Sequence, residues 1–138
     1  MDLEEAVSRL RFKLDDVKEE DEETKLSDEA LENEIKDAVV EYNSDYETAE
    51  DVEENEEYLV IKLALISCLR ILATRYAQKM DVSSGDINVE MTTRAKRLMN
   101  LASQFQEEYN NIINDPKNKE IEIGTLDRYV ARRDETAG

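Results

Sequence analysis

The sequence predicts an all-α fold: a small antiparallel helical bundle of about four helices with an extended C-terminal arm. The 138 residues include only 3 Gly and 1 Pro, which are too few for the tight turns of a β-sandwich or barrel. Apolar residues recur at steps of three and four through most of the chain, as in amphipathic helices. The length suits one domain. We therefore expect a bundle at 1–115 and an arm at 116–138.

The first predicted helix runs from Asp2 to about Asp16. Asp2, followed by Glu5 three positions later, fits a capping box. The apolar stripe of this helix consists of Leu3, Val7, Leu10, Leu14 and Val17. An acidic loop at 18–25 follows, because five consecutive acids keep a segment solvated.

Ser27 is the predicted N-cap of the second helix. Leu26 before this cap and Leu31 after it form a hydrophobic staple. The buried face of the helix is expected to hold Leu31, Ile35, Ala38, Val39 and Tyr42. The segment 43–57 is acidic and weakly patterned, so we interpret it as an acidic connection or a frayed helix start.

The third predicted helix, from about Glu56 to Met80, is apolar over most of its circumference. Such a helix is enclosed by protein. In so small a domain we expect neighbouring subunits to contribute to its burial. Cys68 lies within this helix, and we expect it to be an ordinary core residue rather than a reactive thiol.

A turn is expected at 81–86, followed by an alternating stretch, Ile87 to Met91, that fits a brief strand or an extended linker. The fourth predicted helix runs from about Thr93, with Thr92 as its cap, to Asn114. Its stripe consists of Ala95, Leu98, Ala102, Phe105, Tyr109 and Ile112. Pro116 ends the helix.

The predicted arm mixes apolar and basic side chains at strand and helix spacings. This composition is typical of segments that dock on a partner. The candidate docking residues are Ile121, Ile123, Leu126, Arg128, Tyr129, Val130, Arg132 and Arg133. A frayed terminus is the structural alternative.

The net charge of −17 is concentrated in one part of the chain. Residues 1–57 hold 24 acids and 6 bases, whereas residues 58–138 hold 11 acids and 12 bases. Nucleic acid and anionic membranes are therefore poor partners. The absence of His and the single Cys exclude His-dependent catalysis, His-metal sites and an internal disulfide. We expect no enzymatic activity, no cofactor, no metal site, no signal peptide and no membrane span.

One basic cluster, Arg94, Lys96 and Arg97, would lie in the first turn of the fourth predicted helix, where the helix dipole disfavours cations. These side chains either form a solvated face or meet an acidic partner. That partner would be the chain's own N-terminal acids or those of an adjacent copy.

Four helical segments resemble, in this order, the head–tail adaptor (connector, head completion) proteins of tailed bacteriophages. The similarity covers about Leu3 to Asn114 and is carried best by Leu26–Leu31 (LSDEAL) and Gly85–Leu98 (GDINVEMTTRAKRL). The long apolar helix YLVIKLALISCLRILATRYAQKM also belongs to it. The strong acidic run Glu19–Glu23 and the segment beyond Pro116 depart from the family pattern.

The resemblance implies a structural protein of the virion neck, assembled in the bacterial host cytoplasm. Family members form a homo-oligomeric ring, usually of twelve copies, below the portal protein, and their C-terminal segments grip the portal. The ring extends the DNA channel and is the platform for the next head-closure or tail neck protein. Double-stranded DNA would pass through the channel without specific binding.

An acidic DNA mimic that inhibits a DNA-binding protein is the alternative function. A mimic needs carboxylates spread over a face at phosphate-like spacing. Here the acids gather in two runs, around Glu19–Glu23 and Glu47–Glu57. A generic helical interaction module is a further possibility.

Overall fold

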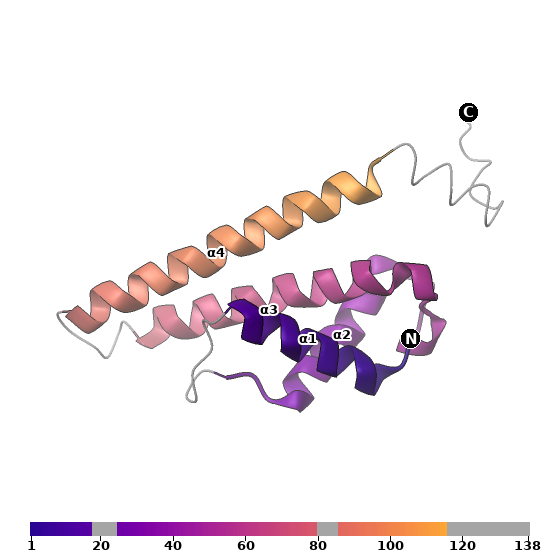
Figure 1. The fold of residues 1–138 in the computed structure, drawn as a ribbon, viewed down its shortest axis with the longest axis horizontal. Helices are drawn as coiled ribbons and strands as arrows, with labels where there is room; N and C mark the ends of the chain where they lie inside the picture. Colours follow the sequence, from indigo (N-terminus) through magenta and orange to yellow (C-terminus); the bar gives the residue numbers. More distant parts are fainter. Residues whose placement is uncertain (18–24, 80–85, 116–138) are drawn as a thin grey trace. The chain divides into compact units, whose positions relative to one another are not determined.

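The computed structural model describes residues 1–17, 25–79 and 86–115, and every regular element within them is helical (Figure 1). The elements are α1 (Leu3–Val17), α2 (Asp28–Tyr42), the short 3₁₀ helices η1 (Ala49–Asp51) and η2 (Glu54–Glu56), α3 (Glu57–Lys79) and α4 (Asp86–Ile113). The all-α prediction is confirmed for these residues, none of which lies in a strand.

The chain divides into two compact units, Met1–Gln106 and Glu107–Gly138. The first unit holds α1, α2, α3 and most of α4, and it contains the core. Of the second unit, the structure describes the last turns of α4 and the residues that follow to Asp115. The predicted acidic loop 18–25, apart from Lys25, and the predicted arm 116–138 lie outside the described residues.

α1 begins where the sequence predicts. The Glu4 amide donates a hydrogen bond to Asp2 Oδ1 at 3.1 Å, which satisfies one of the unpaired N–H groups at the helix start. The buried residues Ala6, Leu10 and Leu14 follow one another at steps of four. They form the face that packs against α2 and α3.

α2 has the predicted N-terminus. Ser27 Oγ accepts a hydrogen bond from the Ala30 amide at 3.1 Å. Leu26 and Leu31, the predicted staple pair, are both fully buried. The buried face consists of Leu31, Ile35, Ala38 and Val39, and Tyr42 at its end is half-buried.

The segment between α2 and α3 is more ordered than the sequence suggests. The carboxylate of Asp51 accepts hydrogen bonds from the amides of Glu47 (2.7 Å) and Thr48 (3.1 Å) around η1. Ala49 and Val52 are buried. The prediction of a weakly structured connection missed these turns, because short 3₁₀ helices carry no amphipathic period.

α3 is the central helix of the first unit. Most of its side chains are buried: Leu59, Val60, Ile61, Leu63, Ala64, Leu65, Ile66, Cys68, Leu69, Leu72, Ala73 and Tyr76. α2 is its main packing partner, and α1 and η2 also contact it. The expectation that neighbouring subunits are needed to bury this helix is therefore wrong. The chain's own helices cover it.

α4 begins at Asp86 and not near Thr93, so Ile87–Met91 is helical. This corrects the expectation of a strand or extended linker there, and also that of a cap at Thr92. Ile87 and Met91 are four residues apart, and the same spacing leads on to Ala95. The segment thus satisfies a helical period as well as an alternating one, and a short apolar run does not distinguish the two.

Side-chain contacts join α3 to the part of α4 that belongs to the first unit. Leu98 and Ala102 are fully buried. Arg94 lies over the Tyr76 ring, with its Cζ 5.4 Å from the ring centroid, near one end of α3. Lys62 Nζ lies 5.0 Å from the centroid of Phe105, toward the other end of α3. Two cationic side chains placed over aromatic rings therefore contribute to the contact between α3 and α4.

Ser27→Ala tests the predicted helix cap. Loss of the Oγ acceptor should lower the free energy of unfolding by about 1 kcal/mol, measured by urea denaturation followed by circular dichroism. Ser8→Ala is the matched control, because Ser8 is exposed within α1. An equal loss in both variants would contradict the assignment of Ser27 as the cap.

Candidate functional site

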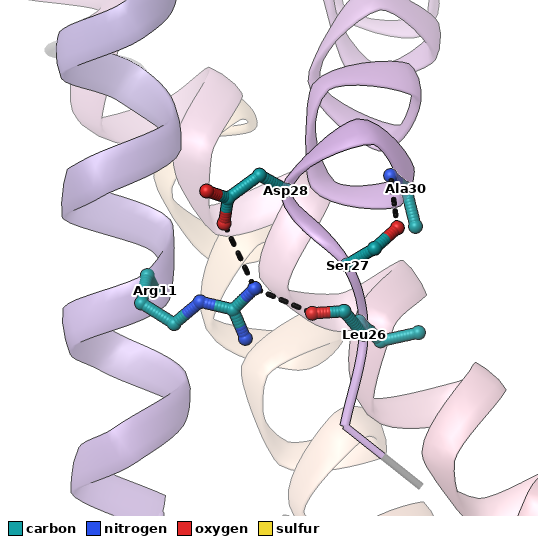
Figure 2. Close-up of polar contacts among 5 residues, drawn as sticks. All are labelled: Arg11, Leu26, Ser27, Asp28 and Ala30. Atoms are coloured by element: carbon teal, nitrogen blue, oxygen red, sulfur yellow. Dashed lines mark hydrogen bonds and ion pairs between the residues drawn. The ribbon is translucent and has the colours of Figure 1, made fainter.

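The N-terminal end of α2 is held by a clamp from α1 (Figure 2). Arg11 Nη2 donates to the Leu26 carbonyl oxygen and forms an ion pair with Asp28 Oδ1 at 3.0 Å. The Arg11 side chain is 19% exposed, whereas the Asp28 side chain is 82% exposed. The ion pair is therefore open to water and contributes little by itself, and the partly buried hydrogen bond to the Leu26 carbonyl is the better shielded contact. The clamp fixes the start of α2, where the predicted cap and staple lie.

The other end of α2 is tied to the start of α3 through Glu56. The hydroxyl groups of Tyr42 (2.9 Å) and Tyr46 (2.8 Å) donate to its two carboxylate oxygens, and the Glu53 amide also donates, at 3.0 Å. We call these four residues the Glu56 cluster. In the next residue, Glu57 Oε1 pairs with Arg9 Nη1 of α1 at 2.9 Å. α1, α2 and α3 are thus joined by polar contacts at this end.

The Glu56 cluster changes the acidity of Tyr46. Partial burial, together with the hydrogen bond to Glu56 and the charge of that carboxylate, raises the pKa of Tyr46 to about 12. Each cause disfavours the negatively charged phenolate. Tyr46 therefore acts as a hydrogen-bond donor over the ordinary pH range, and the cluster serves to hold the structure together.

An acidic surface lies on the turns between α2 and α3. Its members are all exposed: Asp45, Glu47, Glu50, Asp51, Glu53 and Glu54. The two backbone amides at Asp51 lower the pKa of its carboxyl group, which keeps it ionised to lower pH. This surface holds six of the 24 acids in residues 1–57.

The predicted basic cluster, Arg94, Lys96 and Arg97, does not lie in the first turn of its helix as expected. Arg94 lies well inside α4, because the helix begins at Asp86, so the expected conflict with the helix dipole does not arise. Arg94 Nη1 donates to the Tyr76 hydroxyl at 3.4 Å, so this arginine contacts its own chain. Lys96 and Arg97 are exposed.

The predicted docking residues of the arm, Ile121, Ile123, Leu126, Arg128, Tyr129, Val130, Arg132 and Arg133, lie outside the described residues. Their role stays a prediction. Cys68 is fully buried, which confirms its expected place in the core.

Sequence analysis missed the exposed apolar side chains. The large ones among the described residues are Phe12 (73% exposed), Val40 (49%), Tyr58 (49%), Met99 (45%) and Ile113 (37%). Phe12 stands out because it falls between Leu10 and Leu14 but off their stripe. That offset is visible in the sequence and would have identified Phe12 as a surface aromatic.

Among the described residues, no group of three or more metal-ligating side chains converges on one point. No helix in this part of the chain has the length and apolar character needed to cross a membrane. A scan against protein-family models, a search of curated proteins and a search of solved structures each found no match.

Tyr46→Phe tests the Glu56 cluster through pH. A pKa raised in the folded state gives stability that is fully present below the unfolded pKa, near pH 10, and is lost as pH rises toward about 12. Over that interval the wild-type free energy of unfolding should fall more steeply than that of Tyr46→Phe, in urea denaturation at several pH values. The matched control, Tyr58→Phe, should follow the wild type. Parallel wild-type and Tyr46→Phe curves would contradict the role of Tyr46.

Proposed function

We propose that the protein is a structural component of a bacteriophage neck, a head–tail adaptor that forms a ring below the portal. In this role it extends the DNA channel and is the platform for the next head-closure or tail neck protein. The protein performs no chemistry and contributes only surfaces. The observation that carries the proposal is the resemblance of four consecutive segments to the adaptor family, each of which lies largely on one of the four α-helices.

The two segments that carry the resemblance best have identifiable structural roles. Leu26–Leu31 supplies the cap and staple of α2, and Arg11 clamps it from α1. Residues 86–98 form the first half of α4. The resemblance therefore involves residues that define helix starts and packing in this fold, and not only a general helical composition. This supports the proposal.

The acidic surface between α2 and α3 fits a conduit for DNA. Carboxylates repel phosphates, so a wall that carries them lets the duplex slide, whereas a basic wall would hold it. A DNA mimic would also use an acidic surface, so the acidic DNA mimic remains the alternative function. The two functions differ in their partner: a portal ring in one case, a DNA-binding protein in the other.

Portal binding by the full chain is the direct test. Incubated with the portal ring encoded in the same genome, the wild type should add a ring-shaped layer in negative-stain images and should cosediment with the portal. Leu126→Ser, Tyr129→Ser and Val130→Ser combined should abolish cosedimentation, because apolar side chains anchor such interfaces. Deletion of residues 116–138 should do the same while largely preserving helicity.

Asn118→Ser is the matched control in the arm and should bind like the wild type. Unchanged binding by the triple variant would refute the docking role of the arm. A wild type that ignores the portal but forms a salt-sensitive complex with a DNA-binding protein would favour the mimic instead.

A further inference from the structure

Two exposed apolar side chains, Phe12 and Met99, lie beside charged residues, which are acidic next to Phe12 and basic next to Met99. Phe12 on α1 is 73% exposed and Met99 on α4 is 45% exposed. Single exposed apolar residues are ordinary on protein surfaces. A pair with complementary surroundings is more informative, because apolar anchors with a charged rim are the usual composition of a specific interface.

The first of these surfaces, which we call the α1 surface, consists of Phe12, Asp15 and Asp16. The two acids follow Phe12 by three and four residues, so all three side chains share one face of the helix. All three are exposed. The α1 surface therefore presents an aromatic ring with negative charge on its C-terminal side.

The second surface, which we call the α4 surface, consists of Lys96, Met99 and Asn100. Lys96 precedes Met99 by three residues, and all three side chains are exposed. The α4 surface therefore presents a thioether with positive charge on its N-terminal side. Lys96, Met99 and Asn100 all belong to the first compact unit.

We propose that the α1 surface of one copy of this chain packs antiparallel against the α4 surface of a second copy. Phe12 would then lie on Met99, and a sulfur atom against an aromatic ring is a favourable contact. The register follows from the spacing: three residues rise about 4.5 Å in either helix. Antiparallel packing therefore brings Asp15 and Asp16 opposite Lys96. Parallel packing would leave the charges apart.

A second copy is the occupant that these observations favour. Each surface carries the charge that the other lacks, and together they offset part of the repulsion between two chains of net charge −17. The two surfaces belong to different helices, so the contact is head-to-tail and each copy keeps one open surface of each kind. Such a contact closes into a ring or continues as a filament. The biological role of this interface rests on the proposed adaptor function.

Self-association of the full chain tests the interface. In sedimentation velocity over a concentration series, the wild type should form higher oligomers. Phe12→Ser and Met99→Ser should each weaken association about tenfold or more, as expected for anchor residues. Val40→Ser is the matched control, since Val40 is also exposed, and should associate like the wild type. A monomeric wild type throughout the series, or full association by Phe12→Ser, would overturn the proposal.

Mixing the variants tests the head-to-tail geometry. A copy with Phe12→Ser keeps its α4 surface, and a copy with Met99→Ser keeps its α1 surface. An equimolar mixture should therefore yield a two-copy complex that grows no further, because both outer surfaces are blocked. Absence of that complex would refute the pairing of these two surfaces.

A charge exchange tests the register. Lys96→Glu should weaken association several-fold, and Asp15→Lys in the same chain should restore most of it. No rescue would contradict the antiparallel arrangement.

The portal experiment separates this proposal from the adaptor function. If the wild type and Phe12→Ser layer equally well on the portal, the interface is wrong and the adaptor function stands. If association depends on Phe12 but the wild type ignores the portal, the interface stands and the adaptor function is wrong.

Discussion

The structure depends on the enclosure of α3 by the helices of its own chain. Complete burial of one large aliphatic side chain contributes on the order of 2 kcal/mol, and Ile61, Ile66, Leu69 and Leu72 are all buried to within about one per cent. The apolar stripes of α1, α2 and α4 are suited to cover this helix. The chain can therefore build its core alone. Any contact between copies must therefore be made by exposed side chains, because the buried ones already pack in the core.

Polar contacts give this packing a defined geometry. Apolar burial is non-directional, so it does not by itself fix how far α2 slides along α3. Arg11 holds the first turn of α2, and the Glu56 cluster joins its last turn to the beginning of α3. Because charge-assisted hydrogen bonds tie one end of α2 to α1 and the other end to the start of α3, the position of α2 against these two helices is defined. The surfaces that α1 and α2 present are correspondingly fixed.

The sequence predicts the helices that have a periodic apolar pattern and misses the features that have no such pattern. Ser27, Leu26 and the stripe of α2 were found because caps and amphipathic periods are local patterns. The start of α4 was misplaced, because Ile87–Met91 fits two periods equally well. The turns around Asp51 were missed for lack of any period. Arg94 contacts Tyr76, a residue distant in sequence, so only the packed structure could reveal this contact. The burial of α3 could not be predicted from the sequence, because it depends on how much apolar surface the other helices place against α3 in the folded chain.

The core position of Cys68 makes this thiol a reporter of motion. It is the only cysteine of the chain, and none of its surface reaches solvent in the folded state. A thiol-labelling reagent can therefore reach it only when α3 becomes uncovered. The rate of labelling measures how often the bundle opens, without any engineered probe. Labelling rates measured before and after assembly would show how much a larger complex slows the opening of the bundle in each copy.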